Sequence, residues 1–422
     1  MLAAGTIVTG GSLLALEAGG RQETQKALPK ILTTVERVAE NVSTGVVHGW
    51  HSNHLLMHQG VLYADGRVPD PAAKNTWKCS GAFWRKKPHG TWEKVTVIPQ
   101  PPYLMAMGTD GRMWQVAPSD YSHAEVLRMA RPLDFDSFEM PYDGTSVYMG
   151  ASVSPGGNFL ILHAETSDKT AFKPNALVSA FYQRETDTWH KGRFVTPEGR
   201  YGYIGILLKG RKALAVLNST IADPEAVPDP PHYSSRHVRL ARSDDLTKGQ
   251  WLQKPFLMPA YGDTHLQDFV EAPNGNAYLS YQQCSSDTSY ADSQRQPLRH
   301  YIAKIKLDLT ADVSPTGIEA SAARILFDTQ GNWYLVGRPS GGGDLHLWAL
   351  DSERGFRPKK EYELPGTDKL EGYVIHTLCP TRFGSQADGN TVHLLTARYL
   401  RDGGTKPTGA ELWYARFDLP SK

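Results

Sequence analysis

Four histidines, His48, His51, His54 and His58, stand close together in the stretch VVHGWHSNHLLMHQG, residues 46–60. Imidazole titrates near neutral pH, so such a cluster can transfer protons, bind a substrate, hold a metal ion or pack as a polar loop. On an extended strand His51 points away from the face that the other three share, and those three are strung too far apart for one ion. The spacing is also unlike the helical H-E-x-x-H zinc motif. Catalytic or substrate-binding imidazoles are therefore favoured, with polar packing and a turn-assisted metal site as alternatives.

A repeated unit of two strands joined by a Gly-containing turn surrounds and follows this cluster. Examples are HSNHLLMHQGVLYAD, VYMGASVSPGGNFLILHAE and ILFDTQGNWYLVGRP, and the units start near residues 51, 102, 147, 201, 265, 325 and 373. Segments such as RHYIAKIKL and ELWYARF alternate with a period of two, which indicates strands rather than helices. The pattern predicts an all-β chain, a single seven-bladed β-propeller of four-stranded antiparallel blades. A two-domain β-sandwich is the alternative.

The last unit is short of one strand, and KILTTVERV near the N-terminus can supply it and so close the ring. We therefore assign residues 26–422 to the propeller. Residues 1–25 are apolar and rich in small residues, which is typical of an export signal or a disordered terminus. We expect an exported bacterial protein, monomeric, with no membrane span in its mature form.

Composition excludes several other classes of protein. Lys+Arg number 45 and Asp+Glu 44, so no basic surplus favours nucleic acid or an anionic membrane. Cys79, Cys284 and Cys379 lie far apart without C-x-x-C spacing, which indicates neither a disulfide scaffold nor a structural zinc site. We expect no cofactor and assign no metal ligand, although a structural metal ion stays open.

In a propeller the innermost strands converge on the axis, and residues just before or just after them can meet across blades. Polar and aromatic residues recur at these positions of the repeat: His51, Tyr148, Tyr201, His265 and His376 before the strand, and Asp65, Arg67, His163, Gln282, Arg338 and Arg398 after it. Arginine pairs bidentately with carboxylates, and histidine or tyrosine can move protons. Trp50 and other tryptophans can stack on sugar faces. These positions favour an acidic-sugar site, with structural packing as the alternative for each residue.

Asp, Gly or Thr beside a tryptophan in DTWHKGRF, HGTWEKV and SDDLTKGQW looks like a degenerate Asp-box turn. With these turns, the repeat resembles the neuraminidase-repeat propellers that act on rhamnose- and uronate-containing polysaccharides. These include seven-bladed ulvan and rhamnose–glucuronate lyases, and the related α-L-rhamnosidases. Resemblance to the rhamnosidases implies an essential histidine in the first blade, which is His48, with His51 as its competitor. Resemblance to the lyases implies a tyrosine at Tyr148 and places His163 where the lyases carry arginine.

The expected function is that of an exo-acting glycoside hydrolase releasing a terminal sugar, α-L-rhamnose linked to glucuronate, from a complex polysaccharide. In this hypothesis His48 or His51 handles the proton. Substrate-binding residues are Arg67, Tyr201, His265, Arg338 and Trp50. A polysaccharide lyase that uses Tyr148 and His163 in β-elimination is one alternative. A non-catalytic glycan-binding propeller is the other.

Overall fold

The structure is a computed structural model of the 422-residue chain. The residues that it describes are 27–43, 49–73, 78–98, 101–118, 124–129, 137–139, 149–165, 175–197, 201–219, 221–222, 233–234, 237–257, 264–283, 299–372, 374–378, 383–384, 388–401 and 407–420. His48 and Tyr148 lie outside these ranges, as do residues 1–26.

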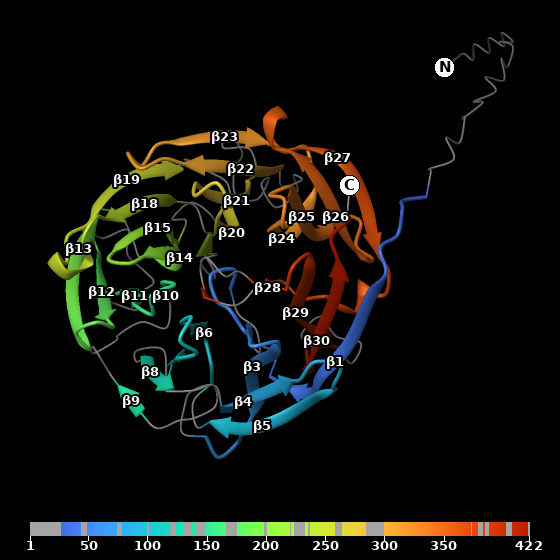
Figure 1. Ribbon diagram of the computed structural model, residues 1–422, viewed down its shortest axis with the longest axis horizontal. Coiled ribbons are helices and arrows are strands. Elements are labelled where there is room, and N and C mark those ends of the chain that lie inside the picture. The colour runs from blue at the N-terminus through green and yellow to red at the C-terminus, as the bar shows by residue number, and fades with distance from the viewer. Residues whose placement is uncertain are drawn as a thin grey trace, which may run out of the picture.

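The described residues form seven four-stranded antiparallel sheets, which are arranged as blades around a central axis (Figure 1). Blade 1 comprises β2 (Leu55–His58), β3 (Val61–Pro69), β4 (Cys79–Lys86) and β5 (Trp92–Ile98). Blade 2 comprises β6 (Leu104–Met107), β7 (Met113–Pro118), β8 (Ala124–Met129) and β9 (Ser137–Glu139). Blade 3 comprises β10 (Met149–Val153), β11 (Phe159–Ala164), β12 (Asn175–Gln183) and β13 (Thr188–Thr196). Blade 4 comprises β14 (Tyr201–Lys209), β15 (Lys212–Ser219), β18 (Val238–Ser243) and β19 (Leu252–Leu257).

Blade 5 comprises β20 (Thr264–Glu271), β21 (Ala277–Gln283), β22 (Arg299–Ile305) and β23 (Ala311–Pro315). Blade 6 comprises β24 (Ala320–Phe327), β25 (Trp333–Pro339), β26 (Leu345–Asp351) and β27 (Arg357–Leu364). Blade 7 comprises β28 (His376–Thr377), β29 (Thr391–Leu400), β30 (Gly409–Asp418) and β1 (Thr33–Val42). The pair β16 (Ile221–Ala222) and β17 (Tyr233–Ser234) extends from blade 4. The expected propeller of four-stranded antiparallel blades is confirmed, and the innermost strands begin within about five residues of the predicted repeat starts.

The N-terminal strand closes the ring, as its sequence predicted. β1 pairs antiparallel with β30, with Thr33 opposite Phe417 and Arg37 opposite Trp413. Residues near the two ends of the chain therefore share one blade, which lies beside blade 1 in Figure 1.

Blades hold together through apolar side chains that alternate between their two neighbours. On β2, Leu56 joins the cluster shared with blade 2, whereas Leu55 and Met57 join the cluster shared with blade 7. Inner strands such as Leu104–Met107 and Met149–Val153 are buried along their whole length, which is why they read as unbroken apolar runs.

In the outer turns of blades 4 and 6, an aspartate begins a 3₁₀ turn by accepting a backbone hydrogen bond, and a glycine ends it. Asp245 accepts from the Thr247 backbone N–H at 3.2 Å and begins the 3₁₀ turn η1 (Leu246–Lys248), which ends at Gly249 with φ of 64°. Two further 3₁₀ turns are η2 (Ser352–Arg354) and η3 (Thr367–Lys369). No helix among the described residues is long and apolar enough to cross a membrane.

Candidate active site

Residues 49–54, which precede β2, lie near the axis of the ring, inside the innermost strands (Figure 1). Gly49 has φ of 78°, and the next five residues, 50–54, are each 8 % exposed or less. The ring of Trp50 packs against Gly205 of blade 4 and Phe269 of blade 5. The Asn53 carbonyl accepts from the Met105 N–H of blade 2 at 2.8 Å. We call residues 49–54 the plug, because they fill the channel and contact several blades.

The plug requires glycine at position 205. A Cβ there would lie 2.7 Å from Trp50 Cη2 and 3.2 Å from Phe269 Cβ. Because packed interiors tolerate extra atoms poorly, Gly205→Ala is expected to lower the free energy of unfolding by about 1–3 kcal/mol in urea titrations. Gly156→Ala is the matched control, since its Cβ would meet only Ser154 Oγ at 3.9 Å. Equal stability of the two variants would show that Trp50 does not occupy this position.

His51 belongs to an aromatic cluster at the end of the channel where the inner strands begin. Its Nε2 lies 2.5 Å from the Tyr103 hydroxyl. Its ring also contacts Tyr203 of β14, with centroids 5.1 Å apart. Tyr203 is half-buried, so it links the buried imidazole to the surface. A hydrogen-bonded imidazole and phenol can pass a proton between them, which is the property required of an acid–base pair.

His54 forms a second hydrogen-bonded pair three residues further on. Its Nδ1 lies 2.6 Å from Asp65 Oδ1, and the other carboxylate oxygen accepts from Gln115 Nε2 at 3.0 Å. The His54 and His376 rings meet edge to face at 5.0 Å. His54 Nε2 is buried and has no hydrogen-bond partner in the structure. A carboxylate that fixes one ring nitrogen and leaves the other free is the arrangement of an oriented general base or acid.

The hairpin register explains why His54 meets Asp65. Gln59 and Gly60, with φ of 50° and 75°, form a two-residue turn, the primed type that right-twisted strands prefer. His58 then pairs with Val61 and Leu55 with Ala64, so His54 stands next to Asp65, whose N–H donates to the His54 carbonyl at 3.2 Å. We call His51, Tyr103, His54, Asp65 and Gln115 the axial cluster.

Arg324 ties the plug to blades 5, 6 and 7. A β-bulge between Ser321 and Arg324, with Ala322 at φ of 52°, turns this side chain toward the axis. Its guanidinium donates to the Trp50 carbonyl at 2.9 Å, to the Ile375 carbonyl, and to Asp268 Oδ1 at 3.4 Å. Arg324 and Asp268 are 2 % and 1 % exposed, so the plug rests on a buried ion pair.

Of the residues predicted from the sequence, His51 and Arg67 lie at the same end of the channel. Arg67 follows Asp65 on β3, is 7 % exposed, and directs its Nε toward the Pro102 carbonyl at 3.5 Å. His265, on β20, is exposed. His163 is buried at the end of β11, and its Nδ1 donates to the adjacent Ala164 carbonyl at 2.9 Å. Of the four, His51 is bonded within the axial cluster, through Tyr103.

Three other predicted residues, Tyr201, Arg338 and Trp50, make contacts within the body of the propeller. Tyr201 is fully buried in the apolar cluster between blades 3 and 4. The Arg338 guanidinium donates to the carbonyls of residues 370–372, at 3.0 Å for Glu371. Trp50 forms the plug itself, and Trp84, Trp333 and Trp348 lie in the apolar clusters, which favours packing over sugar stacking for these side chains. His48 and Tyr148 fall outside the described residues.

Two buried histidines should make the fold sensitive to acid. Burial lowers the pKa of His163 from 6.5 to about 4 and that of His300 to about 3. As the pH falls, the unfolded chain takes up these protons before the folded chain does. The contribution of the two histidines to the free energy of unfolding is therefore constant above about pH 6.5 and falls as the pH drops toward 4. Each group contributes roughly 1.4 kcal/mol per pH unit in that window.

Urea midpoints measured between pH 7 and pH 4 check this dependence. His163→Gln and His300→Gln should each flatten the decline below pH 6.5, whatever their effect at pH 7. A decline that is as steep in both variants as in the wild type would place its source elsewhere in the chain.

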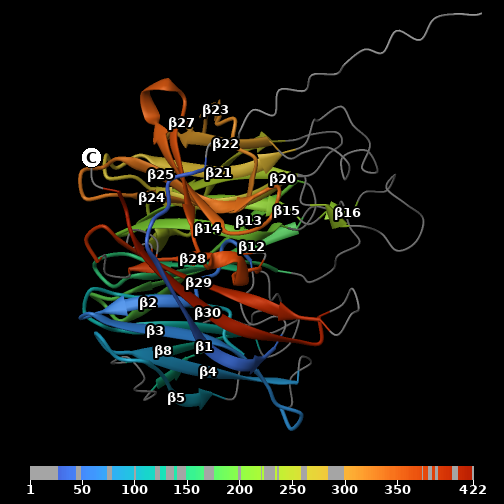
Figure 2. The same ribbon diagram turned by 90° about the vertical axis from the view of Figure 1, so that its right-hand side faces the viewer.

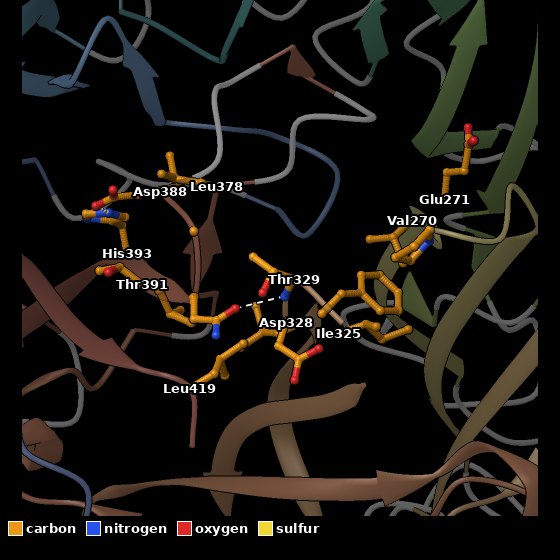
Figure 3. Close-up of a pocket in the computed structure, with 16 residues that line it drawn as sticks. Val270, Glu271, Ile325, Asp328, Thr329, Leu378, Asp388, Thr391, His393 and Leu419 are labelled. Carbon is orange, nitrogen blue, oxygen red and sulfur yellow. Dashed lines mark hydrogen bonds and ion pairs between the residues drawn. The ribbon is translucent and has the colours of Figure 1, made fainter. Parts of the chain in front are cut away.

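A pocket of about 290 Å³ lies at the opposite end of the ring, between the hairpin turns of blades 5, 6 and 7 (Figure 3). His393 bonds the Tyr414 hydroxyl at 2.7 Å and Asp388 at 3.1 Å, so both of its nitrogens are occupied. Burial lowers the pKa of His393. Asp328 accepts from the Asn332 N–H at 2.8 Å within its own turn. Because these polar groups satisfy one another, a structural role is favoured here.

Comparison with known proteins supports the fold. No protein-family model and no curated protein matches the chain. Among solved structures, it is similar to a PL25 ulvan lyase bound to -[GlcA(1-4)Rha3S]-, with a TM-score of 0.60, 9% identity, and coverage of 89% of this chain and 94% of that one. It is also similar to the polysaccharide lyase Uly1, with a TM-score of 0.53, 10% identity, and coverage of 88% and 90%. At such identities the likeness establishes the β-propeller fold alone.

Metal ligation finds no support in the part of the chain that the structure describes. There, no group of three or more His, Cys, Asp and Glu side chains is arranged to hold an ion. His54 and His376 contact each other through their rings.

Proposed function

We propose that the protein is an exported carbohydrate-active enzyme, an exo-acting glycoside hydrolase that removes a terminal sugar from a complex polysaccharide. The expected sugar is α-L-rhamnose linked to glucuronate. The observation that carries the proposal is the axial cluster, where two imidazoles three residues apart each have their own hydrogen-bonded partner. Hydrolysis of a glycosidic bond needs one group to protonate the leaving oxygen and one to activate water.

The two pairs can divide these tasks. His51 with Tyr103 can hold the proton for the leaving oxygen, because either atom of that hydrogen bond can carry it. His54 can take a proton from water through Nε2, because Asp65 holds Nδ1 and stabilises the imidazolium that forms. Arg67 lies two residues beyond Asp65 on the same strand, where a cation suits a glucuronate carboxylate.

The plug favours exo action. Since Trp50 fills the channel against Gly205 and Phe269, a glycan cannot thread through the ring and must enter from one face. We infer that a chain end, approaching from that face, is the part of the glycan that reaches the axial cluster. The apolar residues 1–25 support export.

A polysaccharide lyase is the second candidate, favoured by the close His51–Tyr103 pair and by the fold that the chain shares with ulvan lyases. Beta-elimination also needs a cation against the uronate carboxylate. His163 cannot supply it near neutral pH, because burial lowers its pKa to about 4. Arg338 is occupied by backbone carbonyls. Of the cations considered, these contacts leave Arg67 as the one that beta-elimination would use, which is the residue that the hydrolase proposal also places against the carboxylate.

Product analysis of gum arabic and ulvan digests tests the proposal. The expected result is a monosaccharide that accumulates while the polymer size falls little, with no rise in ultraviolet absorbance. An unsaturated uronate would establish the lyase instead. Binding to either polysaccharide without any product would favour a non-catalytic glycan-binding propeller.

A further inference from the structure

A second pocket, of about 650 Å³, lies between blades 4 and 5. It is built from the hairpin turns at the far ends of the inner strands, opposite the end where the axial cluster lies. Figure 2 shows β16 on the right-hand side of the molecule in the edge-on view. The pocket lies at the other end of β15, whose first residues, 212–214, line it. Its size lies within the range of small-molecule sites.

The pocket is lined by an excess of cations. Its basic residues are Lys209, Lys212, Arg242, Lys304 and Lys306, and its acidic residues are Asp244 and Glu271. The whole chain, in contrast, has a formal net charge of only +1. The lining of this pocket therefore carries more basic than acidic side chains, unlike the chain as a whole.

Two of these lysines take part in no ion pair with another described residue. Lys209 pairs with Glu271 at 2.7 Å, Arg242 with Asp244 at 3.0 Å and Lys306 with Asp312 at 2.6 Å. Among the ion pairs of the described residues, none includes Lys212 or Lys304.

The hairpin places two like charges opposite each other. Lys209 pairs with Lys212 across the turn between β14 and β15. Like charges directly opposite on adjacent strands are destabilising. Glu271 offsets the charge of Lys209, so a bound anion would act mainly on Lys212, which gives the pocket a physical reason to prefer a negatively charged ligand.

A buried polar group also lines the pocket. Ser243 is 1 % exposed, and its Oγ has no hydrogen-bond partner in the structure. The Arg242 Nε is likewise buried without a partner. Leaving a buried donor unsatisfied costs about 1–3 kcal/mol, so a ligand oxygen that reaches either atom would gain a hydrogen bond that the protein alone does not make.

Apolar walls complete the site. Leu207, Leu214 and Ile305 line it, together with Leu307, which is 75 % exposed. A ligand that contacts both the cations and these leucines must carry an acidic group on an apolar body or an apolar sugar face.

We propose that this pocket binds a carboxylate-bearing organic anion of up to disaccharide size. The site is separate from the axial cluster, and its existence does not depend on the proposed catalysis. The carboxylate lies against Lys212 and Lys304, with the Ser243 hydroxyl and the Arg242 Nε–H as donors. The remainder of the ligand covers Leu207 and Leu307.

Isothermal titration calorimetry with three probes tests the proposal. A glucuronate-containing disaccharide and octanoate represent the two sources of carboxylate, and lactose is the neutral control. At least one acid should bind, more weakly at high salt, and whichever binds identifies the source. The Lys212→Gln/Lys304→Gln variant should weaken binding at least tenfold and Ser243→Ala about threefold to tenfold.

Matched variants keep this result distinct from the proposed function. Lys191→Gln, at an exposed position on β13, should bind like the wild type, and His54→Ala should alter cleavage without altering binding here. Lactose binding as strongly as the acids, or wild-type affinity in the double lysine variant, would overturn the proposal. So would the absence of binding by both acids.

Discussion

His54→Ala is expected to lower kcat on the cleaved polysaccharide by about 10²- to 10⁴-fold, the range that a positioned acid or base contributes. The physical reason is that His54 is the one imidazole of the axial cluster whose Nδ1 is held by a buried carboxylate while Nε2 is left without a partner. Steady-state rates, measured together with urea unfolding, separate lost chemistry from lost folding. A loss of kcat with little change in the urea midpoint is the expected pattern.

Asp65→Asn provides a finer test of the same pair. The amide keeps the shape of the side chain but cannot stabilise an imidazolium at His54, so kcat should fall and its pH dependence should shift. A purely structural Asp65 would move neither the pH profile nor the ratio of kcat to KM.

His346→Ala is the matched control, because His346 makes the same kind of contact with a carboxylate, Glu361 at 2.5 Å, on blade 6 away from the axis. It should keep wild-type kcat. His51→Ala should be as damaging as His54→Ala, since each pair has its own task. Full activity in both His51→Ala and His54→Ala would remove the axial cluster from the mechanism.

Arg324→Met should cause the largest loss of stability, about 3–5 kcal/mol, because it leaves Asp268 as an uncompensated buried charge. The Trp50 and Ile375 carbonyls lose a donor at the same time. Urea titration gives the free energy of unfolding. Arg357→Met, at an exposed position on β27, should stay within about 0.5 kcal/mol of the wild type.

The double variant Arg324→Met/Asp268→Leu distinguishes a buried charge from lost packing. Removing both partners should recover part of the stability that the single change loses, because no lone charge is left in the interior. If the loss in free energy of unfolding in the double variant equals the sum of the losses in the two single variants, the two side chains do not act as a pair.

The sequence was sufficient to predict the propeller and its closure. Period-two strands and Gly turns predicted the start of each inner strand, and KILTTVERV was correctly placed as the strand that completes the last blade. The strands and turns are encoded locally in the sequence, and the closure follows from the observation that the last repeat lacks one strand. The contact between His54 and Asp65 was also predictable, because the turn at Gln59 and Gly60 fixes the register that brings them together.

Contacts between blades could not be predicted in the same way. Nothing local to Trp50 indicates that it fills the channel against Gly205, or that His51 meets Tyr103 of blade 2. Tyr201 and Arg338 occupy the predicted ends of their strands, yet one is buried in the core and the other donates to neighbouring carbonyls. The position of a residue along its strand predicts at which end of the channel the residue lies. The packing between blades, however, decides whether its side chain reaches the axis.

The most direct test of the proposed function is a single digest of gum arabic in which free rhamnose and unsaturated uronate are both quantified. Wild-type protein should release rhamnose without any unsaturated product, and His51→Ala/His54→Ala should release none while remaining folded by circular dichroism. Unsaturated uronate from the wild type, or rhamnose release that persists in the double variant, would contradict a hydrolase that uses the axial cluster.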